Sequence, residues 1–139
     1  MKHKLSKTYL KDLVYNVNGA AIEVHKSLGP GLLESIYHRC MEKELSTKDF
    51  NYKTELIIPI NYKGMSLDAN LKCDLFVENC LVVELKSVEK VLPIHEAQLL
   101  TYMKLLKAPI GLIINFKVTN IYKEGQQTFV NEFYRYLEE

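Results

Sequence analysis

Two short apolar runs, residues 75–77 and 81–83, are separated by only three residues and most constrain how this chain can fold. Runs of this length are typical of buried β-strands, and the short connection predicts an antiparallel hairpin. Three charged residues, Asp74, Glu84 and Lys86, lie in or beside these runs. Burying such groups costs several kcal/mol unless they are paired or bound to a metal ion. The pattern therefore indicates that the three side chains have a function.

The length of the hairpin connection decides which face of the sheet each charged side chain occupies. Glu84 and Lys86 are two positions apart on one strand and therefore share a face. A connection of three residues, 78–80, places Asp74 opposite Glu84, whereas a connection of two residues turns Glu84 to the other face. Asn79 suits the longer connection because asparagine tolerates a positive φ. We therefore predict three connecting residues and two converging carboxylates.

The rest of the chain alternates between helical and extended patterns. Apolar residues recur at helical spacing over 10–28, 32–45 and 94–106. Apolar runs predict strands over 52–62, 65–77, 81–86 and 110–116. Pro59 places the first strand at a sheet edge or marks a bulge. The pattern of 119–123 suits a short strand, and that of 129–137 suits a strand, a helix, or one after the other. We expect the α/β (α+β) class, with helices flanking a central mixed β-sheet.

Composition limits the classes of protein to which the chain can belong. Of its 139 residues, 47% are hydrophobic and 25% are charged, and the net charge is +1. We expect residues 1–139 to form a single globular domain. Because the overall charge is nearly neutral, any contact with nucleic acid must come from a local patch. No signal peptide and no apolar run long enough for a membrane span is recognisable, so we expect a cytoplasmic protein without a membrane partner.

Two converging carboxylates beside an ammonium group suggest metal-assisted chemistry on a phosphodiester. Mg²⁺ prefers carboxylate oxygens, usually one or two together with water and phosphate oxygens. We expect Asp74, Glu84 and the backbone carbonyl of Leu85 to bind Mg²⁺ or Mn²⁺. Lys86 would hold or deprotonate the attacking water, or neutralise the charge of the pentavalent phosphorus intermediate. The alternative is a half-exposed strand on which these residues form ion pairs of little energetic weight.

Two of the predicted helices carry further candidate residues. Glu34 begins the second helix, and Tyr37 follows one turn later. The third helix carries His95, Gln98 and Tyr102 on one polar stripe, separate from its apolar row. The stripe can face the site or can be a solvated surface. Glu34 can join the site or can simply complement the positive end of its helix.

These segments together resemble the GxxExxY proteins, which are small members of the PD-(D/E)XK nuclease superfamily related to RecB-like exonucleases. The resemblance covers about residues 13–116 and rests on AAIEVHKSLGPG, GLLESIY, DLFVENCLVVELKS and HEAQLLTYMKLLKAPIGLIINF. It implies a restriction-endonuclease-like core with a four-stranded central mixed sheet. It also implies metal-dependent hydrolysis of phosphodiester bonds.

The resemblance assigns roles to individual residues. It makes Glu34 the helix glutamate, Asp74 the acidic residue of the PD element, Glu84 and Lys86 the (D/E)XK element, and Gln98 with Tyr102 the QxxxY element. Glu34 is then expected to reach the metal ion through water, and Tyr37 and His95 to join Gln98 and Tyr102 in binding substrate. Cys73 replaces the proline of the PD pair, which binds no metal.

The resemblance implies nucleic acid as the partner, with DNA favoured over RNA. The main alternative is a module that keeps the nuclease fold and binds nucleic acid or assembles with other proteins, but has little activity of its own. A chain of this length without an added DNA-binding domain keeps a homodimer or a protein partner open as well.

Overall fold

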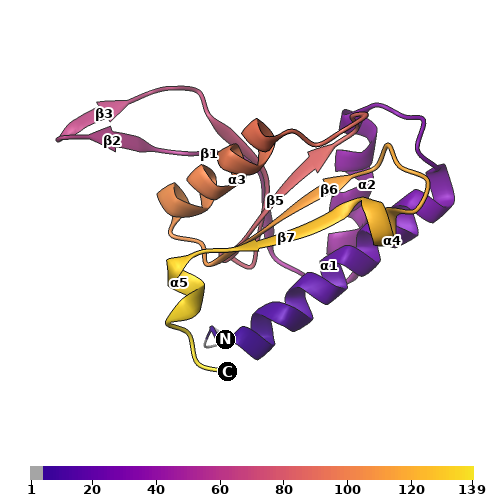
Figure 1. Cartoon of the computed structure of the whole chain (residues 1–139), viewed down its shortest axis with the longest axis horizontal. Coiled ribbons are helices and arrows are strands. Elements are labelled where there is room, and N and C mark those ends of the chain that lie inside the picture. The colour runs from indigo at the N-terminus through magenta and orange to yellow at the C-terminus, as the bar shows by residue number, and fades with distance from the viewer. Residues whose placement is uncertain (1–4) are drawn as a thin grey trace.

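The computed structural model describes residues 5–139 and contains a five-stranded mixed sheet flanked by helices, as expected (Figure 1). Its elements are α1 (Lys7–Leu28), α2 (Glu34–Thr47), β1 (Tyr52–Ile57), β2 (Ile60–Tyr62), β3 (Met65–Leu67), β4 (Lys72–Val77), β5 (Leu81–Lys86), α3 (Pro93–Leu106), β6 (Ile110–Asn115), α4 (Ile121–Glu124), β7 (Gln126–Val130) and α5 (Glu132–Arg135). The strand order is β1-β4-β5-β6-β7, and only β5 and β6 pair in parallel. Among residues 5–139, no helix is long and apolar enough to span a membrane.

Two apolar clusters cover the two faces of the sheet, and side chains of β5 contribute alternately to one cluster and the other. Leu81 and Val83 belong to the cluster formed with α1 and α2, whereas Val82 belongs to the cluster formed with Leu99 of α3. Because successive strand residues point to opposite faces, Glu84 follows Val82 toward the side of α3. Both faces of β5 are therefore covered, and Glu84 is buried in the middle of the sheet.

The connection between β4 and β5 has the three residues that the sequence predicts. The register pairs Leu75 with Val83, so Asp74 lies opposite Glu84 when the register is continued by one residue. Asn79 has a φ of 55°, and the residue before it is also in the left-handed region. The expectation that asparagine supplies a positive φ in this connection is therefore confirmed.

The sequence and the structure differ at several elements. The single strands expected over 52–62 and 65–77 are each divided, the first into β1 and β2 and the second into β3 and β4, and a fifth strand, β7, extends the expected sheet. The prediction of a strand at 119–123 is wrong, because α4 forms there with Asn120 as its cap. The Asn120 Oδ1 accepts the backbone N–H of Lys123 at 3.1 Å, which favours a helical turn. Over 129–137, the end of β7 is followed by α5, which was one of the expected alternatives.

Gly125 allows a close approach between the end of α4 and β6 that a side chain would prevent. A Cβ added at Gly125 would collide with the backbone oxygen of Asn115 and lie 2.8 Å from Cγ1 of Ile121. A backbone oxygen cannot move aside unless β6 moves with it. We predict that Gly125→Ala lowers the free energy of unfolding by about 1–3 kcal/mol.

Gly19, in the middle of α1, provides the matched control. A Cβ added there meets no atom within 4 Å. Gly19→Ala should therefore raise the free energy of unfolding by about 0.5–1 kcal/mol. Urea denaturation followed by circular dichroism measures both variants. A Gly125→Ala protein as stable as the wild type would contradict the packing described here.

Candidate active site

Two carboxylates lie where β4 and β5 stop pairing through their backbones. The backbone ladder between these strands ends at the pair Leu75–Val83. Beyond it, the backbone N–H of Asp74 donates to Oε2 of Glu84 at 2.8 Å. The backbone N–H of Leu85 donates to Oδ2 of Asp74, also at 2.8 Å. Each carboxylate thus takes the place of a backbone carbonyl and is fixed in the space between the two strands.

Burial makes the negative charge of this pair costly. The side chain of Glu84 is nearly inaccessible, and residue Glu84 is 5% exposed. Desolvation, followed by the charge of Asp74, raises the pKa of Glu84 to about 8. Desolvation also raises the pKa of Asp74, although the hydrogen bond from Leu85 acts in the opposite direction. Among residues 5–139, neither carboxylate forms a salt bridge. The surroundings therefore do not offset the negative charge that the pair would carry when both groups are ionised.

Lys86 and Glu34 are in the same electrostatic environment as the two carboxylates. Lys86 is the last residue of β5 and is half-buried, and its charge lowers the pKa of both Asp74 and Glu84. Glu34 is the first residue of α2. Desolvation, then the charge of Asp74, raises the pKa of Glu34, whereas Lys86 lowers it. The fold therefore brings together the four residues that the sequence singled out as catalytic candidates.

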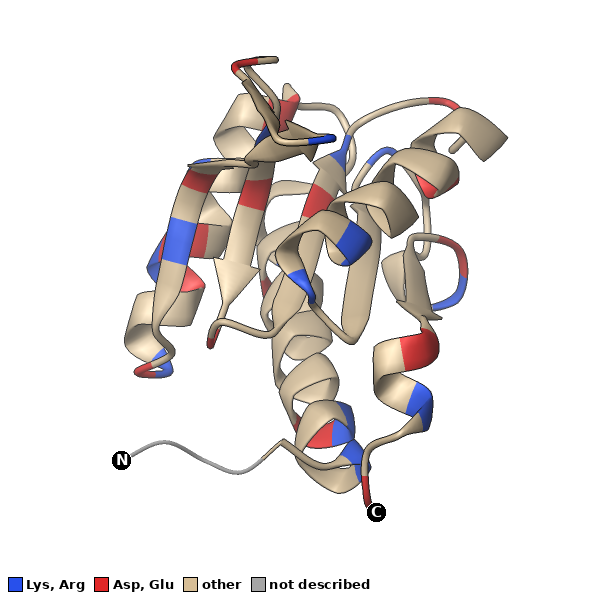
Figure 2. Ribbon diagram, turned by 90° about the vertical axis from the view of Figure 1, so that its left-hand side faces the viewer, with Lys and Arg blue, Asp and Glu red and all other residues tan. Residues whose placement is uncertain are grey.

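Two further residues lie close to Asp74, although they were not among the predicted site residues. Glu55 lies between Thr54 and Leu56, which pair with Leu75 and Cys73 on either side of Asp74. Its charge adds to desolvation, the main cause, in raising the pKa of Asp74. Figure 2 shows the acidic positions of β1, β4 and β5 as red segments on neighbouring strands. His38 lies one helical turn after Glu34, and its Nε2 is 2.7 Å from Oγ1 of Thr54. Residues four positions apart share one face of a helix, so the sequence could have placed His38 on the side of Glu34. The position of Glu55 could be found only from the pairing of the strands.

A groove beside Asp74 gives the site access to solvent. Its volume is about 620 Å³, and it is lined by Glu34, Ser35, His38, Arg39, Glu42, Thr54, Glu55 and Asp74. A cavity of about 690 Å³ between α1, α2, α4 and β7 shares no residue with this groove. We place the site at the smaller cavity because Asp74, which is hydrogen-bonded to Glu84, lines it together with Glu34.

The polar stripe on α3 reaches the site at one end only. Tyr102 is buried, and its pKa is raised by desolvation and then by the charge of Glu84, which places it near that carboxylate. Gln98 is exposed one turn earlier on the same helix. His95 accepts the backbone N–H of Leu92 through Nδ1 at 3.0 Å and so caps the start of α3. The structure thus places Tyr102 beside Glu84. His95, in contrast, has a structural role at the start of α3.

Tyr37 supports the loop between α1 and α2. Its hydroxyl donates to the carbonyl of Gly29 and accepts the backbone N–H of Leu32 at 3.1 Å. Its ring stacks on that of Phe116 with 4.3 Å between centroids. Because no part of Tyr37 is exposed, it cannot contact a bound substrate, and the expectation of such a contact has to be revised. Tyr37 instead fixes the loop that leads into Glu34.

Asn115 and Ser87 fix the chain at the point where β5 ends. Asn115 is buried and pairs with Lys86 in the parallel register. Its Oδ1 accepts the backbone N–H of Val88 at 3.1 Å, and its Nδ2 donates to the carbonyl of Val88 at 2.9 Å. Ser87 Oγ donates to the carbonyl of Leu32 at 2.8 Å. The backbone that carries Lys86 is therefore held from both sides. The polar residue inside an apolar run was the sequence signal for Asn115.

The donor set suits a hard divalent cation that keeps some of its water. Among residues 5–139, no group of three or more His, Cys, Asp or Glu side chains is arranged to hold a metal ion. Asp74 and Glu84 nevertheless keep Oδ1 and Oε1 outside the two backbone hydrogen bonds. One or two carboxylates with water and phosphate oxygens are what Mg²⁺ commonly takes from a protein site. A cation there would also offset the charge that burial makes costly.

Comparison with known proteins gives one match. The family model of the PD-(D/E)XK nuclease superfamily matches residues 11–129. No curated protein and no solved structure matches the chain. The matched range includes both carboxylates, Lys86, Glu34 and all five strands of the main sheet apart from Val130, the last residue of β7.

The raised pKa of Glu84 predicts that the metal-free protein loses stability as the pH rises. Between the ordinary value of 4.5 and the folded value of about 8, the folded state binds more protons at this group than the unfolded state does. The free energy of unfolding should therefore be highest below this window and fall with rising pH, by up to about 1.4 kcal/mol per pH unit from this group. Urea denaturation in EDTA across the window measures the slope.

Two variants isolate the contribution of Glu84 to this slope. Glu84→Gln should make the slope shallower, although the raised pKa values of Asp74 and Glu34 keep part of it. Glu23→Gln, on the exposed surface of α1, should leave the slope unchanged. A slope that is the same in wild type and Glu84→Gln would show that Glu84 is not the buried, protonated group described here.

Proposed function

The chain belongs to the PD-(D/E)XK nuclease superfamily, and from this premise we propose that it is a metal-dependent nuclease that hydrolyses phosphodiester bonds of DNA. The exchange of hydrogen bonds between Asp74, Glu84 and the facing backbones carries the proposal, because it holds two acidic groups together beside Lys86. RNA is the second candidate substrate. The motifs of the sequence support the finer assignment to the GxxExxY proteins.

In this proposal, Asp74 and Glu84 would hold Mg²⁺ or Mn²⁺ through the oxygens that are outside the two backbone hydrogen bonds, Oδ1 and Oε1. The backbone N–H of Leu85 is directed at Asp74, and the carbonyl of a strand residue points to the same side as its N–H. The Leu85 carbonyl is therefore a suitable third donor. Glu34, at the start of α2, would contribute through a water molecule. A bound ion would supply the positive charge that polarises the phosphodiester and lowers the pKa of water.

The residues of the chain position the other participants in hydrolysis. The ammonium group of Lys86 holds the attacking water or neutralises the charge that develops on the phosphate oxygens. The oxygen of this water forms a bond to phosphorus while the bond from phosphorus to the leaving sugar oxygen breaks. The water gives up one proton to solvent, and the leaving sugar oxygen takes one proton from solvent to become a hydroxyl. Asn115 and Ser87 keep Lys86 in place by fixing the backbone after β5. Gln98 and Tyr102, on α3, are the proposed contacts with the substrate phosphate.

Three substitutions test this assignment. Purified protein is incubated with single-stranded, duplex and branched DNA and with RNA, in the presence of Mg²⁺ or Mn²⁺. We expect Asp74→Asn and Lys86→Met to lower the cleavage rate by at least about 100-fold, because each removes a charge that acts on the transition state. Lys90→Met, four residues further along and exposed, should leave the rate unchanged.

Measurements of metal binding distinguish the role of Asp74, which is to bind the metal ion, from that of Lys86, which is to act on the water or the phosphate. They also distinguish a nuclease from a binding or assembly module. Calorimetric titration should show that Asp74→Asn loses affinity for Mn²⁺, whereas Lys86→Met keeps it. Cleavage that survives both substitutions would exclude the proposed site. If the wild type binds Mn²⁺ but cleaves no substrate, the protein acts as a binding or assembly module.

A further inference from the structure

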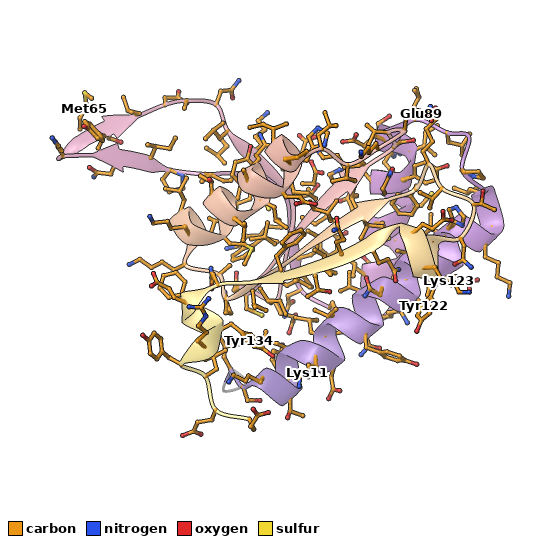
Figure 3. All side chains as sticks on the ribbon, viewed as in Figure 1. Lys11, Met65, Glu89, Tyr122, Lys123 and Tyr134 are labelled. Atoms are coloured by element: carbon orange, nitrogen blue, oxygen red, sulfur yellow. The ribbon has the colours of Figure 1, made fainter. Side chains whose placement is uncertain are left out.

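The segment of residues 58–71, here called the arm, projects from the sheet beside the proposed active site. Its strands β2 and β3 form a two-stranded sheet of their own, away from the five-stranded sheet. Figure 1 shows the arm extending away from the helices, and Figure 3 shows Met65 at its far end. The arm continues directly from β1 and β4, the two strands that carry Glu55 and Asp74. The root of the arm is therefore close in the chain to both acidic residues.

The root of the arm is fixed to the body of the protein, whereas its strands are not. Ile58 is buried among the residues that pack on α3, and its backbone N–H donates to the carbonyl of Leu71 at 2.9 Å. From this pair to the turn at Lys63 and Gly64 there are about six residues, which span roughly 20 Å in an extended strand. Both turn residues have a positive φ, as a tight two-residue hairpin turn requires.

The register of the arm gathers its large side chains on one face. Tyr62 lies opposite Met65, and Ile60 lies opposite Leu67, so all four side chains share a face. The other face carries the small polar pair of Asn61 and Ser66. Tyr62 is 56% exposed and Met65 is 53% exposed. A two-stranded hairpin is marginally stable by itself in water, and an apolar face this open indicates a surface that binds something.

A second copy of the chain does not fit this face well. An aromatic side chain has roughly 150–250 Å² of surface, so Tyr62 at 56% exposure offers about 100 Å². Four such side chains provide at most about 400 Å² on each copy, about half of the roughly 800 Å² per partner of a stable interface. Duplex DNA does not fit well either, because it presents charged phosphates and polar groove edges and keeps its base faces stacked.

Unpaired nucleotides match both features of the arm. Their bases offer flat apolar faces that stack on aromatic side chains without regard to sequence, and their phosphates attract cations. Lys63 at the tip lies 5.3 Å from the centroid of the Tyr62 ring, and Lys72 is exposed at the root. One cation therefore lies at each end of the apolar face, and the one at the root is two residues from Asp74.

We propose that the arm binds the unpaired nucleotides of a single strand and guides that strand to the carboxylate site. This inference rests on the proposed nuclease function and narrows its substrate to single-stranded or frayed nucleic acid. An arm of roughly 20 Å spans about six stacked nucleotides, so the length of the strand should matter. Affinity should rise steeply as the strand becomes long enough to cover the arm.

The test measures binding in EDTA, where cleavage does not take part, by fluorescence anisotropy of labelled oligo-dT. Tyr62→Ala should weaken the binding of a strand of about twelve nucleotides by about 5- to 150-fold, and should have little effect on a strand of about four. Binding of a duplex should stay within about twofold. Ser66→Ala, on the opposite face of the same hairpin, is the matched control and should bind as the wild type does.

A second variant removes the arm, with two glycines replacing residues 59–70 between Ile58 and Leu71. Ile58 and Leu71 are already hydrogen-bonded to each other, so two glycines can connect them. Thermal unfolding checks that the rest of the protein is still folded. This variant should lose the length dependence of single-strand binding. Equal binding by wild type and both arm variants would overturn the inference, as would equal weakening of single strands and duplex. A dimer in ultracentrifugation that Tyr62→Ala abolishes would overturn it too.

The outcomes for the arm and for the nuclease function can be told apart. If Mg²⁺-dependent cleavage is found but does not depend on the arm, the arm inference fails and the nuclease function stands. If arm-dependent binding of single strands is found without any cleavage, the nuclease function fails, and the arm is a binding surface in its own right.

Discussion

The hydrogen bonds that two carboxylates make across the gap between β4 and β5 are the feature on which the rest of the structure depends. A buried backbone N–H has to be paired, so two strands can separate inside a sheet only if another acceptor replaces the lost carbonyl. Oδ2 of Asp74 and Oε2 of Glu84 are those acceptors. The strands can therefore part without leaving unpaired backbone groups, and the acidic side chains are held at the point of separation.

The burial of these two carboxylates lowers the stability of the folded protein, and it also favours the binding of a cation. Burial pushes both carboxylates toward the protonated state, and Lys86 offsets only part of that effect. The shortage of positive charge makes a cation a stabilising ligand in the proposed function. The surrounding contacts keep the gap from collapsing. Tyr37 fixes the loop before Glu34, and Asn115 fixes the chain after Lys86.

The sequence predicts the sheet and its central hairpin well, because local signals decide both. Apolar runs mark β5 and β6, and the three-residue connection alone determines that Asp74 meets Glu84. The closeness of Glu55 to Asp74 depends on a pairing between strands separated by the whole arm, which local patterns do not report. Tyr37 carries the same chemical groups whether it binds substrate or supports a loop, and only its burial distinguishes the two. The prediction of a strand at 119–123 was wrong because the Asn120 cap stabilises a helical turn there, despite the apolar residues that suit a strand.

The central claim is that the gap between β4 and β5 holds a divalent cation between Asp74 and Glu84. Anomalous diffraction from a crystal soaked in Mn²⁺ tests it most directly, because the signal locates the ion without reference to activity. The account predicts one strong peak within about 2.3 Å of Oδ1 of Asp74 and Oε1 of Glu84, absent from crystals of Asp74→Asn. A crystal that binds Mn²⁺ only elsewhere, or that shows no peak while this gap stays open to solvent, would contradict the account.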